Sequence, residues 1–491
     1  MRRYLMIGAS AFLLGAGSMA LVNAAALANS PKPETYHMLE LFGDVLTKVE
    51  NQYVTPVDDK KLIQAAIDGM LTSLDPHSGY LDADSFQDMR DQTRGEYGGL
   101  GLEVSSEEGV VKVISPMDDT PAAKAGIKAG DYITAIDGQS VLNLPLDQAV
   151  KQMRGAVGQA ITLSIAREKQ DPFDVKLVRE VIAVKSVRSH QEGDYGYLRI
   201  SAFNEKTGEE TLSAVKSLEA GNPHMKGLVL DLRNNPGGLL DQAVSVSDVF
   251  LDGGEVVSQR GREAQDIERY NARDGDALHG LPIVVLINSG TASAAEIVAG
   301  ALQDRHRAEL IGLTSFGKGS VQSVIPLHDG SDGALKLTTA RYYTPSGRSI
   351  QKTGIEPDLE VAESKAQAEI VANRSFQFSE ASFRNALNAG EGLTRKAAHS
   401  PAEAPPANYD IKTGDFQLSR ALAVLKAGSV KGLLQSQKPG AAVAVVAAAK
   451  PQPDAVKTDG PTGVSAPARD LKLPEAVKPK SPVGAAAGPR R

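Results

Sequence analysis

The sequence predicts a multidomain α/β protein whose main domain holds a parallel or mixed sheet. The first observation is a repeated order of elements, in which a buried strand is followed by a polar, glycine-containing turn and an amphipathic helix. This order occurs at 227–250 and at 281–303, and the strands at 227–231 and 281–287 are mostly apolar, as strands covered on both faces are. The second observation is a β-rich module at 96–180, inserted before this pattern begins.

The length, net charge and cysteine content of the chain exclude some classes of function. A length of 491 residues allows about three domains, and a hydrophobic content of 42% is sufficient for packed cores. The net charge of −7 offers no basic surface of the kind that binds nucleic acid, so we expect no nucleic-acid partner. The absence of cysteine excludes disulfides and thiolate metal sites.

The amino-terminal residues are typical of an exported protein. Residues 1–3 include two arginines, residues 5–22 are apolar and rich in small side chains, and Ala26-Leu27-Ala28 fits a cleavage site. We therefore expect a signal peptide at 1–28 and a periplasmic mature protein. The alternative is an uncleaved inner-membrane anchor facing the periplasm, because about 18 apolar residues almost span a bilayer.

The regions outside the strand-rich parts have distinct compositions. Apolar residues recur at helical spacing in 29–95, which predicts a helical region. The segment 362–410 is polar and is interpreted as an insertion or linker, and 415–427 as a closing helix. Residues 431–491 are rich in Ala, Pro, Lys and Val without periodicity, which predicts a disordered tail. The predicted boundaries are 1–28, 29–95, 96–180, 181–361, 362–430 and 431–491.

Ser293 lies where a predicted helix begins, after the strand at 281–287 and a turn of small residues. One interpretation is a capping box, because Ser293 and Glu296 have the spacing at which hydroxyl and carboxylate satisfy free backbone N–H groups. The other is a nucleophile, because N–H groups and the helix dipole at that point can stabilise an oxyanion. The turn by itself does not choose between them.

A nucleophilic serine needs a general base, and Lys318 is the candidate. It lies between two glycines and near an apolar segment, where burial would lower an amine pKa from about 10.4 towards 7–8 and make it a base near neutral pH. Gln322 lies on the same face of an extended segment, because residues at even spacing do so. Its neutral amide can orient the amine. The alternative for Lys318 is an exposed loop lysine.

Longer motifs in this part of the chain resemble those of the carboxyl-terminal processing peptidases, also called tail-specific proteases. They are N-S-G-T-A-S-A-A-E-I at 288–297, F-G-K-G-S-V-Q at 316–322, L-T-T-A-R-Y-Y-T-P-S-G-R-S-I-Q at 337–351 and G-I-E-P-D at 354–358. The resemblance implies a serine endopeptidase with a Ser–Lys dyad and no metal or cofactor. In it Ser293 is the nucleophile, Lys318 the base, and Gln322 the residue that positions the base.

The resemblance also implies an oxyanion hole. The turn D-L-R-N-N-P-G-G at 231–238 resembles the family segment whose glycines supply one N–H donor, here Gly237 or Gly238. The second donor is the residue after the nucleophile, Ala294. The alternative for the two glycines is a plain turn.

The module at 96–180 resembles a PDZ domain. The segment 97–102 is similar to the loop that binds a terminal carboxylate, where consecutive glycines expose backbone N–H groups, and an extended peptide would add as a strand beside 102–104. The motifs at 120–131 and 136–138 also fit the PDZ pattern. The expected peptide-binding residues are Gly99, Leu100, Gly101, Leu102, Val104, Ala149, Val150 and Met153.

The resemblance implies partners as well. We expect protein substrates bound through their C-termini, a homodimer or higher oligomer formed by the helical region, and a helical-repeat lipoprotein as a possible adaptor. L-D-P-H-S at 74–78 is similar to the segment that precedes the PDZ domain in this family, and we expect His77 to be structural.

Two other functions are alternatives. S-A-V-K at 213–216 and K-T-G at 352–354 match motifs of penicillin-binding enzymes, but no S-D-N lies between them. The second alternative is a catalytically silent PDZ scaffold or chaperone of the cell envelope. Retention of Ser293, Lys318 and Gln322 argues against it.

Overall fold

The computed structural model describes residues 33–436 except 108, 264, 374–378, 389–399, 407 and 411–413. The predicted signal peptide at 1–28 and residues 437–491 of the predicted tail lie outside this part. No helix within it combines the length and the apolar character that crossing a membrane requires.

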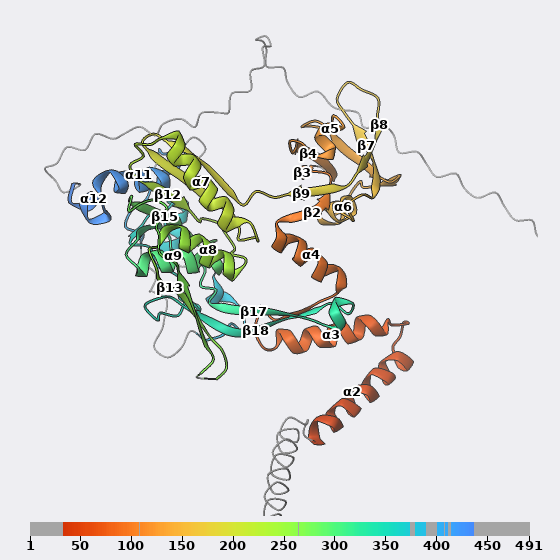
Figure 1. Ribbon diagram of the computed structural model, residues 1–491. Helices are drawn as coiled ribbons and strands as arrows, with labels where there is room; N and C mark the ends of the chain where they lie inside the picture. Colours follow the sequence, from red (N-terminus) through yellow and green to blue (C-terminus); the bar gives the residue numbers. More distant parts are fainter. Residues whose placement is uncertain are drawn as a thin grey trace, which may run out of the picture. The chain divides into compact units, whose positions relative to one another are not determined.

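A six-stranded sheet forms the centre of the main domain (Figure 1). Its order is β10-β11-β12-β15-β16-β19, with β10 and β11 antiparallel and every later pair parallel. The predicted mixed sheet is therefore confirmed. The strands are β10 (Val187–Glu192), β11 (Tyr195–Ile200), β12 (Leu228–Asp231), β15 (Ile283–Ile287), β16 (Ala308–Gly312) and β19 (Leu359–Glu360).

Helices cover both faces of this sheet. Successive residues of a strand face opposite sides, so Leu228 and Leu230 pack into one apolar core while Val229 packs into another. The first core is shared with α7, α8 and α9, and the second with α11 and α12. Burial on both faces explains why the strands are apolar. The helices are α7 (Thr207–Gly221), α8 (Leu240–Phe250), α9 (Ala294–Asp304), α11 (Phe416–Ala427) and α12 (Val430–Ser436).

A second, antiparallel sheet carries the lysine segment. Its order is β1-β18-β13-β14, and β17 pairs with β18 on the other side. Lys318 directly precedes β17, whereas β1 belongs to the amino-terminal region. This sheet therefore joins the amino-terminal region to the segment of the expected base. The elements are β1 (Gly79–Leu81), β13 (Gly254–Arg260), β14 (Ile267–Ala272), β17 (Ser320–Pro326), η1 (His328–Gly330) and β18 (Ala334–Tyr343).

The predicted β-rich module is present. Its sheet has the order β3-β4-β5-β7-β8, with β6 paired to β5, and it packs its own apolar core. A separate pair, β2 and β9, lies where the chain enters and leaves the module. The elements are β2 (Glu96–Gly99), β3 (Leu102–Glu107), β4 (Val110–Pro116), α5 (Pro121–Lys124), β5 (Tyr132–Ile136), β6 (Gln139–Ser140), α6 (Leu146–Met153), β7 (Ala160–Ala166), β8 (Phe173–Val178) and β9 (Glu180–Ala183).

The amino-terminal region forms the predicted helices. These are α2 (Pro33–Gln52), α3 (Asp59–Thr72) and α4 (Ala83–Arg94). The apolar stripe of α2 is uncovered within the described chain: Leu39 is 61% exposed, Phe42 44% and Val45 51%.

One boundary prediction needs correction. The segment 362–410, interpreted as an insertion or linker, contains α10 (Lys365–Asn373) and η2 (Glu380–Ser382), and the carboxylate of Glu380 is fully buried. The tail does not begin at 431, because α12 continues to Ser436. Val430 and Leu433 are buried in the second core, which gives this polar stretch a reason to stay helical.

A buried ion pair ties the end of β12 to the closing helix. Burial opposes ionisation of Asp231, yet bonds from Arg233 and Tyr197 hold the pKa of its carboxyl below the usual value. Arg233 also donates to Asp415 at the start of α11, at 2.6 Å, and to Gln417 at 3.0 Å. Asp231 and Arg233 thus hold the turn after β12 against the helix, as a scaffold does.

We expect Arg233→Met to lower the free energy of unfolding by about 3 kcal/mol, because it leaves the buried charge of Asp231 with fewer partners. Arg273→Met is the matched control: Arg273 pairs with Asp248 but is 87% exposed, so its loss should cost under about 1 kcal/mol. Urea denaturation measures both, and equal losses would contradict the assignment.

Candidate active site

Two turns meet at the carboxyl ends of parallel strands, which is where sites gather in open α/β sheets. The turn after β12 and the turn after β15 are joined through their asparagines, because Asn234 N–H donates to Asn288 Oδ1 and Asn288 Nδ2 donates to Asn234 Oδ1, both at 2.9 Å. Thr291 Oγ1 also donates to Leu232 O at 2.8 Å. These bonds fix the position of the turn that holds Ser293.

Ser293 occupies a strained backbone conformation at the start of α9. Its φ of 53° and ψ of −118° are rare for a residue with a side chain, and such strain collects at functional sites. A strained turn between a strand and a helix also presents the serine of nucleophile elbows, although G-x-S-x-G is absent here. The carboxylate half of the predicted capping box forms, because Glu296 accepts from Ser293 N–H, whereas Glu296 N–H donates to Ser293 O and not to its hydroxyl. Cap and nucleophile are therefore compatible roles.

Glu296 connects the serine turn to the lysine segment. Its carboxylate is fully buried and accepts from Ser293 N–H at 2.8 Å, Gly317 N–H at 2.7 Å and Lys318 N–H at 2.8 Å, and from the Ser315 hydroxyl. Burial raises the pKa of Glu296 to about 7, while these hydrogen bonds favour the ionised form. One carboxylate thus sets the spacing of both candidate catalytic residues.

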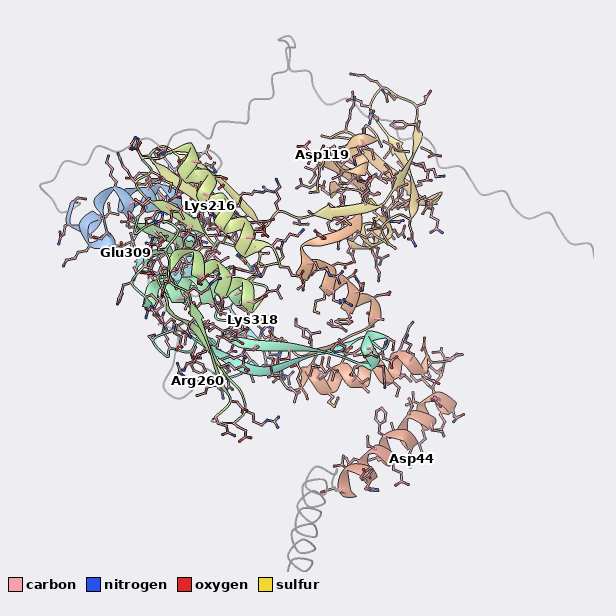
Figure 2. The ribbon with its side chains drawn as sticks, in the orientation of Figure 1. Asp44, Asp119, Lys216, Arg260, Glu309 and Lys318 are labelled. Atoms are coloured by element: carbon pink, nitrogen blue, oxygen red, sulfur yellow. The ribbon has the colours of Figure 1, made fainter. Side chains whose placement is uncertain are left out.

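Lys318 has the electrostatic environment expected of a base. Burial lowers the pKa of Lys318 to about 8, and the positive charge of Lys336 adds to the effect. The carboxylates of Glu380, Glu296 and Asp75 oppose it. The hydrogen bonds among the described residues include none between Lys318 Nζ and Ser293 Oγ, a contact that often tightens only with substrate bound. Figure 2 labels Lys318, just before β17.

Gln322 is held by two hydroxyl groups. Its Nε2 donates to Ser320 Oγ at 2.9 Å and to Thr338 Oγ1 at 3.2 Å. A register shift between Val321 and Gln322 interrupts the pairing of β17 with β18. The shared bond places Ser320 and Gln322 on one face, and the role of Gln322 towards Lys318 stays a prediction.

The expected oxyanion donors lie beside Ser293. A Cβ built on Gly237 would lie 2.8 Å from Ser293 Cβ and 2.9 Å from Ala294 N, so these residues are in close contact. Gly237 N–H donates to Asn235 Oδ1 at 2.9 Å. Among the hydrogen bonds of the described chain, none uses the N–H of Gly238 or Ala294 as donor. The geometry therefore favours Gly238 over Gly237 as the partner of Ala294.

Comparisons with known proteins identify the family of this chain. The model for Peptidase family S41 matches residues 194–361, the PDZ domain model matches 88–166, and the model named activating protease CtpB N-terminal domain matches 8–85. A carboxy-terminal-processing protease of Bartonella bacilliformis is 56% identical over 344 residues, which cover 70% of this chain and 79% of that protein. The chain belongs to the carboxy-terminal-processing proteases. It is a serine-type peptidase.

Other relatives of the protease are more distant. A probable CtpA-like serine protease of Staphylococcus epidermidis is 38% identical, and the match covers 66% of this chain and 65% of that protein. Among solved structures, a photosystem II D1 C-terminal processing protease is 30% identical with a TM-score of 0.40, over 67% of this chain and 93% of the other.

The expected peptide-binding residues of the PDZ domain belong to β2, the loop after it, β3 and α6. Strand β3 is an edge strand of the sheet. Some residues of the expected pocket belong to the domain core, and others lie partly buried at its margin. Gly101 has a φ of 74°, and a Cβ there would lie 2.3 Å from the Thr120 side chain. Leu100, Ala149 and Met153 are buried, Leu102, Val104 and Val150 are partly buried against them, and Gly99 is in β2.

The penicillin-type alternative does not form a site. Ser213 and Lys216 both lie exposed on α7 (Lys216 is labelled in Figure 2). Lys352, of the K-T-G match, donates its N–H to Gly317 O at 2.8 Å and its Nζ to Asn388. These positions are separated in the fold and lack a shared pocket in the described chain.

Sequence reasoning missed three side chains around the lysine segment. Thr338 contacts Gln322, and Glu380 accepts from Gln351 Nε2 at 2.9 Å and contacts His77 Nε2 at 2.7 Å. Asp75 accepts from Thr338 Oγ1 at 3.0 Å. Asp75 and Thr338 lie within motifs that resemble the family, but the motifs do not indicate what these two side chains do. Nothing in the sequence around Glu380 indicates its importance. The described residues contain no cluster of metal-binding side chains.

We expect Gly237→Ala to lower kcat/KM by about 100-fold, the order of effect of damage to an oxyanion site, because the new methyl would collide with Ser293 and Ala294. Gly275→Ala is the matched control: Gly275 also has positive φ, 122°, but a Cβ there meets no atom within 4 Å. Steady-state cleavage of an unfolded reporter polypeptide measures both. Wild-type kcat/KM in Gly237→Ala would show that the site lies elsewhere.

Proposed function

We propose that the protease is a periplasmic endopeptidase that recognises substrate C-termini through its PDZ domain and cleaves by a Ser–Lys acyl-enzyme mechanism. The observation that carries the proposal is the buried Glu296 carboxylate, which accepts from the backbone of both Ser293 and Lys318. It holds a strained serine and a partly desolvated lysine in neighbouring turns. A nucleophile and a base need that arrangement.

The reaction begins with Lys318 in its neutral form. Its amine takes the proton from Ser293 Oγ while the oxygen attacks the scissile carbonyl carbon. The N–H groups of Ala294 and Gly238 stabilise the oxyanion. The protonated amine then gives its proton to the leaving nitrogen as the C–N bond breaks. Water, deprotonated by Lys318, attacks the acyl-enzyme and releases Ser293.

Capture of C-termini is supported by the edge position of β3. The free edge of this strand offers backbone N–H and C=O groups to an extended peptide, and the loop at 99–101 offers further N–H groups to a carboxylate. Apolar side chains at 102 and 150 lie partly buried beside them, which favours an apolar last residue.

The proposed location and assembly rest on the amino-terminal half. The basic start and the Ala-x-Ala site support export to the periplasm, with retention as an inner-membrane anchor as the alternative. The uncovered apolar stripe of α2 supports a homodimer formed through the helical region. A helical-repeat lipoprotein adaptor is a further proposed partner.

We expect wild-type protein to cleave an unfolded reporter polypeptide with an apolar C-terminus, and Ser293→Ala and Lys318→Ala to lose at least about 10³-fold in kcat. A reporter ending in two aspartates is the control for PDZ capture and should be cut more slowly. Equal cleavage by all three proteins would show that Ser293 and Lys318 are not the nucleophile and the base. Binding of the reporter without cleavage by wild type would favour the silent PDZ scaffold.

The pH dependence of kcat/KM should follow Lys318. Because the amine must be neutral and its pKa is about 8, activity should rise about tenfold per pH unit below 8 and level off above it. Initial rates between pH 6 and 10, with circular dichroism confirming an unchanged fold, measure the profile. A flat profile from pH 6 upwards would exclude Lys318 as the base.

A further inference from the structure

The turn at 74–78 reaches the lysine segment through a chain of hydrogen bonds. Asp75 is 3% exposed and Ser78 4% exposed. Asp75 Oδ1 accepts from the N–H groups of His77 and Ser78, at 2.8 and 2.9 Å, and from Thr338 Oγ1 at 3.0 Å. Asp75 Oδ2 accepts from Ser78 Oγ at 2.7 Å. Four donors thus hold this carboxylate opposite β18.

The chemistry of the donors fixes the direction of the chain. An ionised carboxylate only accepts, and a threonine hydroxyl has a single hydrogen, so Thr338 gives that hydrogen to Asp75. Thr338 Oγ1 can then only accept from Gln322, and the group facing it must be the amide Nε2. Among the described residues, no group donates a hydrogen bond to Gln322 Oε1. Asp75 therefore determines which end of the Gln322 amide remains available.

A second carboxylate orients a second glutamine, Gln351, which contacts the backbone next to Lys318. Glu380 is fully buried, and its Oε1 accepts from Gln351 Nε2 at 2.9 Å. This bond leaves Gln351 Oε1 to accept from Gly319 N–H at 2.9 Å, next to Lys318. Glu380 is in turn contacted by His77, from the same turn as Asp75. The turn at 74–78 thus connects to the lysine segment by two routes, through Gln322 and through Gln351.

We propose that Asp75 is a positioning residue, which acts through Thr338 to hold the Gln322 amide with its Oε1 towards Lys318. The inference rests on the proposed roles of Lys318 and Gln322 and adds the element that orients them. If the Gln322 amide were turned the other way, it would present its own N–H groups to Lys318. The N–H groups of the Lys318 amine need an acceptor, which only Oε1 provides. The amino-terminal region is thereby part of the catalytic apparatus as well as a helical appendage.

The charge of Asp75 gives the proposal a second readout. The groups that act on Lys318 are the carboxylates of Glu380, Glu296 and Asp75 and the ammonium of Lys336. Burial opposes ionisation of Asp75, but bonds from Ser78, His77 and Thr338 keep the pKa of its carboxyl below the usual value, so it is charged at neutral pH. Removing that charge destabilises the ammonium of Lys318 and lowers its pKa.

The decisive variants are Thr338→Val, which removes only the hydroxyl, and Thr338→Ser, which keeps it. In full-length protein, with the unfolded reporter polypeptide, we expect Thr338→Val to lower kcat by about 10- to 100-fold with KM nearly unchanged. Thr338→Ser should recover most of the loss. Thr339→Val is the matched control, because Thr339 is exposed and its Oγ1 pairs only with Ser323 Oγ among the described residues, and it should keep wild-type kcat.

Wild-type kcat in Thr338→Val would overturn the proposal, and so would an equal loss in Thr338→Ser. If Thr338→Val does not fold, Asp75→Asn decides, because asparagine keeps the size and an acceptor for the turn. Its kcat should fall and the rising limb of kcat/KM should move to lower pH; an unchanged kcat and profile would overturn the proposal. Lys318→Ala, measured in parallel, separates failure of this inference from failure of the proposed function. Activity in that variant would refute the role of Lys318 as the base.

Discussion

The candidate active site depends on one buried carboxylate. Glu296 is fully buried on the first turn of α9, and it accepts backbone N–H groups from the serine turn and from the lysine segment. A buried carboxylate is stable only when it is hydrogen-bonded, so its donors must stay in place. The two segments come from different sheets, and a second link between them is the bond from Phe316 N–H to Thr291 O at 2.9 Å. The requirement to satisfy Glu296 therefore helps to keep the proposed nucleophile and the proposed base neighbours.

The basicity of Lys318 results from a balance between burial and charge. Burial and Lys336 favour the neutral amine, whereas Glu380, Glu296 and Asp75 favour the ammonium. Without the carboxylates the amine would be a weaker base, and without burial it would stay protonated to well above pH 8. The carboxylates come from three separate parts of the chain. The fold thus sets a pKa that no single segment specifies.

Much of the fold and part of the site followed from local pattern. The apolar runs at 228–231 and 283–287 are strands because branched side chains packed on both faces leave no amphipathic alternative. Ser293 and Lys318 were predicted because their motifs are long and occur in order. Glu380 was not found, because its segment is polar and its importance comes from where it packs. The helix at 430–436 was missed for the same reason, since only contact with the second core stabilises it.

The sequence by itself determined the family, the order of domains and the identities of the candidate nucleophile and base, because these depend on short-range spacing along the chain. Tertiary structure decided the strain at Ser293, the burial of Lys318, and the orientation of Gln322 by Thr338 and Asp75. It also indicated Gly238 over Gly237 as the open donor. Each of these depends on groups far apart in sequence, whose distances and solvent exposure are set only when the sheets and turns assemble.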